Sequence, residues 1–109
     1  MDIFTVFFLL KRYLEKYYMP QNLTIDKTKL DIYLVHDNDS TKNIVISFDS
    51  KLNMFIVIFG KENIKKVAVS TDEETILKYV SIYNTIEEVI ENILLFNNVN
   101  VIKHQYCLN

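Results

Sequence analysis

The amino-acid sequence predicts an α+β fold, and three features of its pattern lead to that class. Apolar residues recur every three or four positions in residues 2–18 and again after residue 71, which is the period of an amphipathic helix. Between these regions apolar and polar residues alternate, which is the period of a strand. The connectors there are short and polar, so neighbouring strands should be antiparallel. With 109 residues, half of them apolar, we expect a single domain over 1–109.

The leading helix is expected over residues 2–18, because Pro20 cannot continue a helix and disfavours helical geometry at Met19. Residues 20–29 are then a polar connector. The helix carries more aromatic side chains than one buried stripe requires, and aromatic residues are enriched at protein interfaces. An oligomer or partner interface is therefore a hypothesis for this helix, involving Phe4, Phe8, Tyr13, Tyr17 and Tyr18.

A four-stranded antiparallel meander is expected next. Its strands are the alternating segments 29–35, 43–49, 53–60 and 64–70. In 53–60 both faces are apolar, so this strand should be central and covered on its second face, by a partner or by the chain's own end. The lysines of 64–70 suit an edge strand.

One kinked helix or two consecutive helices should follow, packed on one face of the sheet. Ser70 or Thr71 can cap the first start, with acids in the first turn. Thr85 and Glu88 have the spacing of a capping box, which marks a second start. We expect the helix to end at Asn97–Asn98, and a short extended segment to follow.

The string Asp37-Asn38-Asp39-Ser40-Thr41 follows an apolar strand and resembles the nucleophile motif of haloacid-dehalogenase-type phosphatases. That resemblance implies an attacking Asp37, an acid/base Asp39 and bound magnesium. The later acidic motif of that family is missing, however, and a strand follows the string where the family has a long crossover. We therefore interpret the string as a hairpin loop of turn-forming residues. A small metal-dependent hydrolase or ligand-binding protein using this loop, with His36, stays as the alternative.

No cofactor and no metal are expected, and catalytic residues are not assigned. His104 and Cys107 have ligand spacing, but a pair does not complete a zinc site. The single Gly60 excludes a glycine-rich phosphate loop. The net charge of −2 disfavours direct nucleic-acid binding, and the apolar run near the N-terminus is too short to span a membrane. The lone cysteine favours a cytoplasmic location, in a host cell if the protein is viral.

Charge is unevenly distributed along the chain. Residues 72–91 contain six acidic side chains and one basic side chain, although the net charge of the whole chain is only −2. Such an acidic surface can dock on a basic groove of a protein that normally holds nucleic acid. The acidic residues are Asp72, Glu73, Glu74, Glu87, Glu88 and Glu91.

The function predicted from these features is non-enzymatic: binding, and thereby inhibiting, another macromolecule through acidic and aromatic surfaces. Small, acidic-faced, glycine-poor α+β proteins are common among phage anti-defence proteins, including anti-CRISPR inhibitors, and among bacterial immunity proteins. A structural homo-oligomer, such as a homodimer through the aromatic first helix, is a further alternative.

Overall fold

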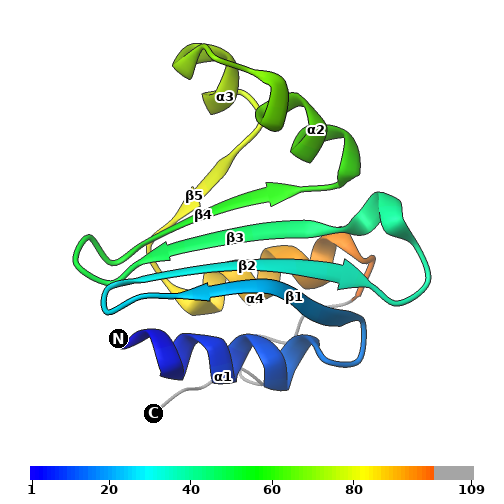
Figure 1. Ribbon diagram of the computed structural model, residues 1–109. Coiled ribbons are helices and arrows are strands. Elements are labelled where there is room, and N and C mark those ends of the chain that lie inside the picture. Colours follow the sequence, from blue (N-terminus) through cyan, green and yellow to red (C-terminus); the bar gives the residue numbers. More distant parts are fainter. Residues whose placement is uncertain (100–109) are drawn as a thin grey trace.

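The computed structural model describes residues 1–99, apart from the side chain of Asn22, and confirms the α+β class (Figure 1). The extended segment expected after Asn98 lies almost entirely outside the described residues. In chain order the elements are α1 (Ile3–Leu14), β1 (Tyr18–Ile25), β2 (Lys29–His36), the 3-10 helix η1 (Ser40–Lys42), β3 (Ile44–Asp49), β4 (Met54–Phe59), α2 (Lys61–Val69), α3 (Glu73–Leu77), β5 (Ser81–Tyr83) and α4 (Ile86–Phe96).

The sheet is a five-stranded meander in the order β1-β2-β3-β4-β5, and every neighbouring pair is antiparallel. The strands predicted at 29–35, 43–49 and 53–60 are present as β2, β3 and β4. Their alternate residues are buried on one face, where α1 and α4 pack against the sheet and against each other. The buried side chains that form this core are Ile3, Val6, Leu10, Leu14, Tyr18, Leu30, Ile32, Leu34, Ile44, Ile46, Phe48, Phe55, Val57, Ile86, Val89, Ile90, Ile93 and Leu94.

In two segments the secondary structure differs in type from the prediction. Residues 64–70 are not an edge strand, because the helix α2 spans Lys61–Val69. Gly60, with φ at 91°, turns the chain out of β4 before these residues. Residues 20–29 are not only a connector, because β1 spans most of them. A proline is tolerated there since β1 is an edge strand.

The helix boundaries also differ from the prediction. α1 ends at Leu14, and Tyr18 already belongs to β1. The cap of α3 is Asp72, whose side chain accepts a hydrogen bond from the backbone N–H of Glu74, whereas Ser70 closes the preceding helix. By contrast, α4 begins as predicted, with the Thr85 hydroxyl accepting from the N–H of Glu88. The strand β5 separates α3 from α4, however, so the prediction of one kinked helix or two consecutive helices is wrong.

The connection between β4 and β5 is weakly packed. It holds α2 and α3, which lie at the opposite end of the molecule from α1 (Figure 1). No residue from 61 to 80 is buried. This connection therefore contributes little to the core that holds the sheet together.

Candidate functional site

The loop 37–41 is a connection between the antiparallel strands β2 and β3. The Asp39 carboxylate caps η1 by accepting the backbone N–H of Thr41 at 3.0 Å, and it also accepts the Thr41 hydroxyl. These hydrogen bonds lower the pKa of Asp39, because they stabilise its charged form. Asp37 is exposed, and its backbone N–H donates to the carbonyl of Tyr17 at 2.9 Å. Asp39 thus has a structural role in the turn.

His36 serves the same turn. Its Nδ1 accepts the backbone N–H groups of Asn38 at 3.1 Å and Asp39 at 3.0 Å. Its backbone N–H donates to Oδ1 of the buried Asn43 at 2.8 Å. Within residues 1–99, no three His, Cys, Asp or Glu side chains are grouped so that they could hold a metal ion. His104 and Cys107 lie outside the described residues.

Tyr18 is a buried junction between three elements. Its side chain is 2% exposed, so it cannot form part of the interface suggested for the first helix. The hydroxyl donates to the carbonyl oxygen of Lys42 in η1 at 2.8 Å and accepts from Nδ2 of Asn97, which follows α4, at 2.8 Å. Burial raises the pKa of this phenol, because the charged phenolate would be poorly solvated there.

The other predicted aromatic residues divide between the core and the surface. Tyr13 and Tyr17 are half-buried against the core. Phe4 and Phe8 point outward and are 62% and 73% exposed. A hollow of about 260 Å³ lies beside Phe8 on the same outer face of α1.

The predicted acidic residues belong to two separate elements. Asp72, Glu73 and Glu74 are exposed at the start of α3. The other group begins α4, which lies on the α1 side of the sheet, so the central strands separate the two groups (Figure 1). This second group consists of Glu87, Glu88 and Glu91. Asp72 and Glu88 take part in helix capping. Capping explains why these two positions are acidic, so no binding partner is needed to explain them.

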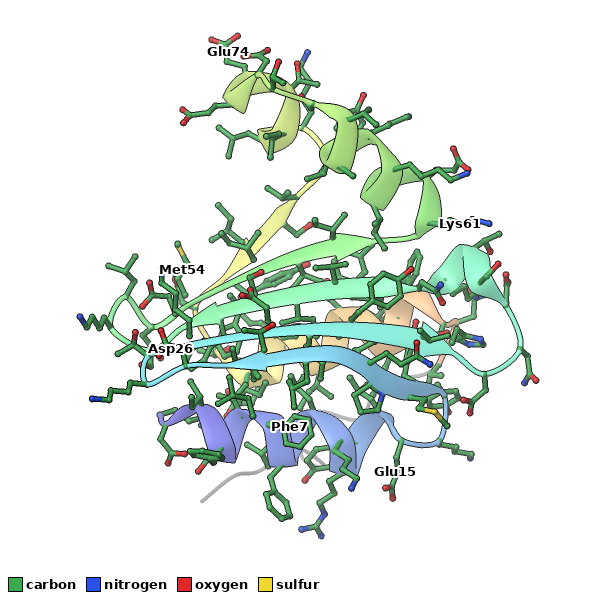
Figure 2. The ribbon with its side chains drawn as sticks, in the orientation of Figure 1. Phe7, Glu15, Asp26, Met54, Lys61 and Glu74 are labelled. Atoms are coloured by element: carbon green, nitrogen blue, oxygen red, sulfur yellow. The ribbon has the colours of Figure 1, made fainter. Side chains whose placement is uncertain are left out.

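The segment that combines charge with exposed apolar side chains is α2–α3, residues 61–80, hereafter the α2–α3 segment. Val69 is 82% exposed and Leu77 is 60% exposed. Figure 2 shows Glu74 at the outer end of α3 and Lys61 at the opposite end of the segment, next to the sheet. The sequence pattern does not predict these exposed apolar positions, because Val69 falls in the strand expected over 64–70 and Leu77 has the helical spacing of a buried residue.

A hollow of about 250 Å³ lies on the sheet face opposite α1 and α4, between β2, β3 and β4. Asp31, Ser47 and Asp49 contribute polar side chains to it. The Asp49 carboxylate accepts the backbone N–H groups of Lys51 and Leu52 in the following turn. This carboxylate is therefore used to shape the β3–β4 turn.

Comparisons of this chain with protein-family models, with curated proteins and with solved structures found no match in any of the three. The helices within residues 1–99 are all too short or too polar to cross a membrane. The fold and its exposed surfaces are therefore what supports a functional proposal.

Proposed function

We propose that this protein is a non-enzymatic interaction module, which binds a basic surface of another protein through the α2–α3 segment and thereby blocks that surface. The observation that carries the proposal is the form of the β4–β5 connection. β4 and β5 are antiparallel neighbours in the sheet, and a hairpin of two to five residues, roughly, suffices to join such strands. Here residues 60–80 intervene, and they form two helices.

Folding does not account for this length. None of the residues 61–80 is buried, so removing the segment would leave the apolar core unchanged. Long connections in compact domains are usually functional or disordered, and this one is helical and capped at Asp72. Val69 and Leu77 are left exposed on it, and exposed apolar side chains beside charged ones are typical of binding surfaces.

The acidic outer end of the segment indicates the kind of partner. Over residues 61–80 four lysines balance four acids, and three of the acids gather at the start of α3. Glu73 and Glu74 are exposed in the first turn of α3 and have no capping role in the described hydrogen bonds. An acidic tip steers association with a basic surface, such as the groove of a nucleic-acid-binding protein. By occupying such a groove, this protein would inhibit the partner to which the groove belongs. That is the mode of action expected of an anti-defence or immunity protein.

A paired charge reversal tests the proposal. The double variant Glu73→Lys/Glu74→Lys should lose the partner that the wild-type protein captures from lysate, and its binding should fall at least about tenfold. The matched control is Glu87→Lys/Glu91→Lys on α4, which makes the same change of charge in the other acidic group, leaves the Thr85–Glu88 cap in place and should keep the partner. Retained binding in the first variant, or a wild-type protein that captures nothing, would refute the proposal.

The apolar part of the surface is tested separately. Leu77→Ser should weaken binding by increasing the dissociation rate, whereas the charge reversal should act mainly on the association rate and its salt dependence. Surface plasmon resonance at two ionic strengths distinguishes the two effects. Leu52→Ser, at an exposed position in the β3–β4 turn, is the control for loss of an apolar side chain.

A further inference from the structure

The outer face of α1 carries a second exposed apolar surface, far from the α2–α3 segment. The inner face of α1 is buried through Ile3, Val6, Leu10 and Leu14. The opposite stripe begins with Phe4 and Phe8, which are more than half exposed although phenyl rings are strongly apolar. We propose that this stripe is the interface of a homodimer, in which α1 packs antiparallel against α1 of a second copy. This proposal concerns a different surface from the proposed function and does not depend on it.

The geometry of the stripe fits pairing of one helix with another. The hollow beside Phe8 is lined by Phe8, Lys11, Arg12 and Glu15. These four residues have the spacing i, i+3, i+4 and i+7, which on an α-helix surrounds a hole that a side chain of a facing helix can fill. Phe4 lies one turn earlier on the same stripe, so it is the side chain available to fill that hole in a second copy.

In one antiparallel register, the rings of Phe4 and Phe8 both fill holes on the helix of the second copy. When Phe4 lies over a hole centred between Lys11 and Arg12 of the second copy, Phe8 lies over a hole centred between Phe7 and Phe8. The same contacts then occur twice about a two-fold axis, which is the arrangement that a closed dimer requires. The two Phe8 rings meet near the axis, and each Phe4 is covered by the basic side chains of the other helix, which favours cation–π contact.

Charge favours the antiparallel direction over the parallel one. Asp2 caps the beginning of α1, whereas Lys11 and Arg12 lie in its last turn and Lys16 follows shortly after its end. Antiparallel pairing brings each basic end over the acidic cap of the other copy and opposes the two helix dipoles. Parallel pairing would bring the basic ends together. Glu15 lies over the same helix start, where the helix dipole favours an acid but the Asp2 carboxylate opposes it.

The size of the surface indicates a weak dimer. Each phenylalanine side chain can bury about 150–250 Å², and about two-thirds of each ring is exposed, so the four rings contribute roughly 500 Å². The stems of the basic residues add to this area. The sum is below the roughly 1,200–2,000 Å² of stable interfaces, so the dimer should dissociate on dilution.

Sedimentation equilibrium of the full chain over a wide concentration range is the primary test. The wild-type mass should rise from 12.9 kDa towards twice that value as concentration increases. Phe8→Glu should raise the dissociation constant at least about tenfold, because a charge would lie at the two-fold axis. Val69→Glu is the matched control, since Val69 is also an exposed apolar residue but lies on α2, at the opposite end of the molecule from α1 (Figure 1). Unchanged thermal melts would show that both variants are folded.

The register is tested by cross-linking in a Cys107→Ser background. Chains carrying Thr5→Cys, mixed with chains carrying Lys11→Cys, should form the mixed disulfide and little of either symmetric one. Symmetric disulfides alone would overturn the antiparallel arrangement. A wild-type monomer at all concentrations, or a dimer that Phe8→Glu leaves intact, would overturn the proposal. If deletion of residues 100–109 were needed for dimerisation, the surface would belong to the chain's own C-terminal segment instead.

Discussion

The hydroxyl of Tyr18 should be a major determinant of stability, and Tyr18→Phe tests it with the removal of one oxygen atom. The side chain is almost completely buried, so the variant ring can occupy the same space. The carbonyl of Lys42 then loses a donor at 2.8 Å, whereas Nδ2 of Asn97 keeps its bond to the carbonyl of Ile93 at 2.9 Å. Leaving one buried acceptor unpaired costs about 1–3 kcal/mol. We expect a loss of about 2 kcal/mol, or roughly 10 °C in Tm for a domain of this size.

Urea unfolding followed by circular dichroism measures this loss. Tyr79→Phe is the control, because its ring lies beneath Lys66 on the weakly packed α2–α3 segment, and it should change stability by less than about 0.5 kcal/mol. If Tyr18→Phe also lowered the free energy of unfolding by less than about 0.5 kcal/mol, the view that this hydroxyl joins β1, η1 and α4 would be refuted.

The pH dependence of the stability of the wild type and of Tyr18→Phe gives an independent check. The pKa of Tyr18 is raised in the folded state, so above pH 10 the unfolded chain loses this proton before the folded chain does. Wild-type stability should therefore fall as pH rises from 10 through the folded-state pKa. Phenylalanine has no proton to lose, so the difference between the wild type and Tyr18→Phe should narrow over that range. A constant difference would contradict the burial of the phenol.

Four further substitutions test other parts of the fold by the same unfolding measurements. Gly60→Ala should destabilise by about 1–3 kcal/mol, because its φ of 91° is strained for alanine and the new Cβ would lie 3.2 Å from the carbonyl oxygen of Thr41; Asn53→Gly, where φ is also positive, should be neutral or slightly stabilising. Ile90→Val should cost about 0.5–1.5 kcal/mol, since Ile90 has no exposed surface and its methylene leaves a cavity. Asp39→Ala should be less stable than the wild type at neutral pH; because the pKa of Asp39 is lowered by folding, that difference should shrink as pH falls below 3.8.

The parts of the fold that were predictable are those with one strong period. α4 has five buried residues at helical spacing and a Thr85 cap, and β2 and β3 alternate over their whole length. In such segments burial of one face and local hydrogen bonding favour the same structure. The boundaries and the helical or extended nature of these elements followed from the pattern alone.

Shorter and weaker patterns were misassigned for identifiable reasons. In 64–70 the spacing of Ile64 and Val67 fits a helix, whereas that of Val67 and Val69 fits a strand, and the strongly bent chain at Gly60 decides for a helix. β1 was missed because Pro20 is excluded from central strands but is tolerated at an edge. The distribution of aromatic residues could not be predicted either, since the exposure of Phe8 and the burial of Tyr18 depend on where α1 ends.

The surface residues that folding explains can be separated from those that it does not. Asp2, Asp39 and Asp72 each cap a helix, and their lowered pKa values reflect that role. The outward Phe8 on α1 and Val69 on the α2–α3 segment are largely exposed, so folding of residues 1–99 does not account for them. These two surfaces lie at opposite ends of the molecule (Figure 1). A dimer joined through α1 would therefore present two copies of the α2–α3 segment at its far ends, and a weak binding surface gains most in strength when two copies engage a symmetric partner together.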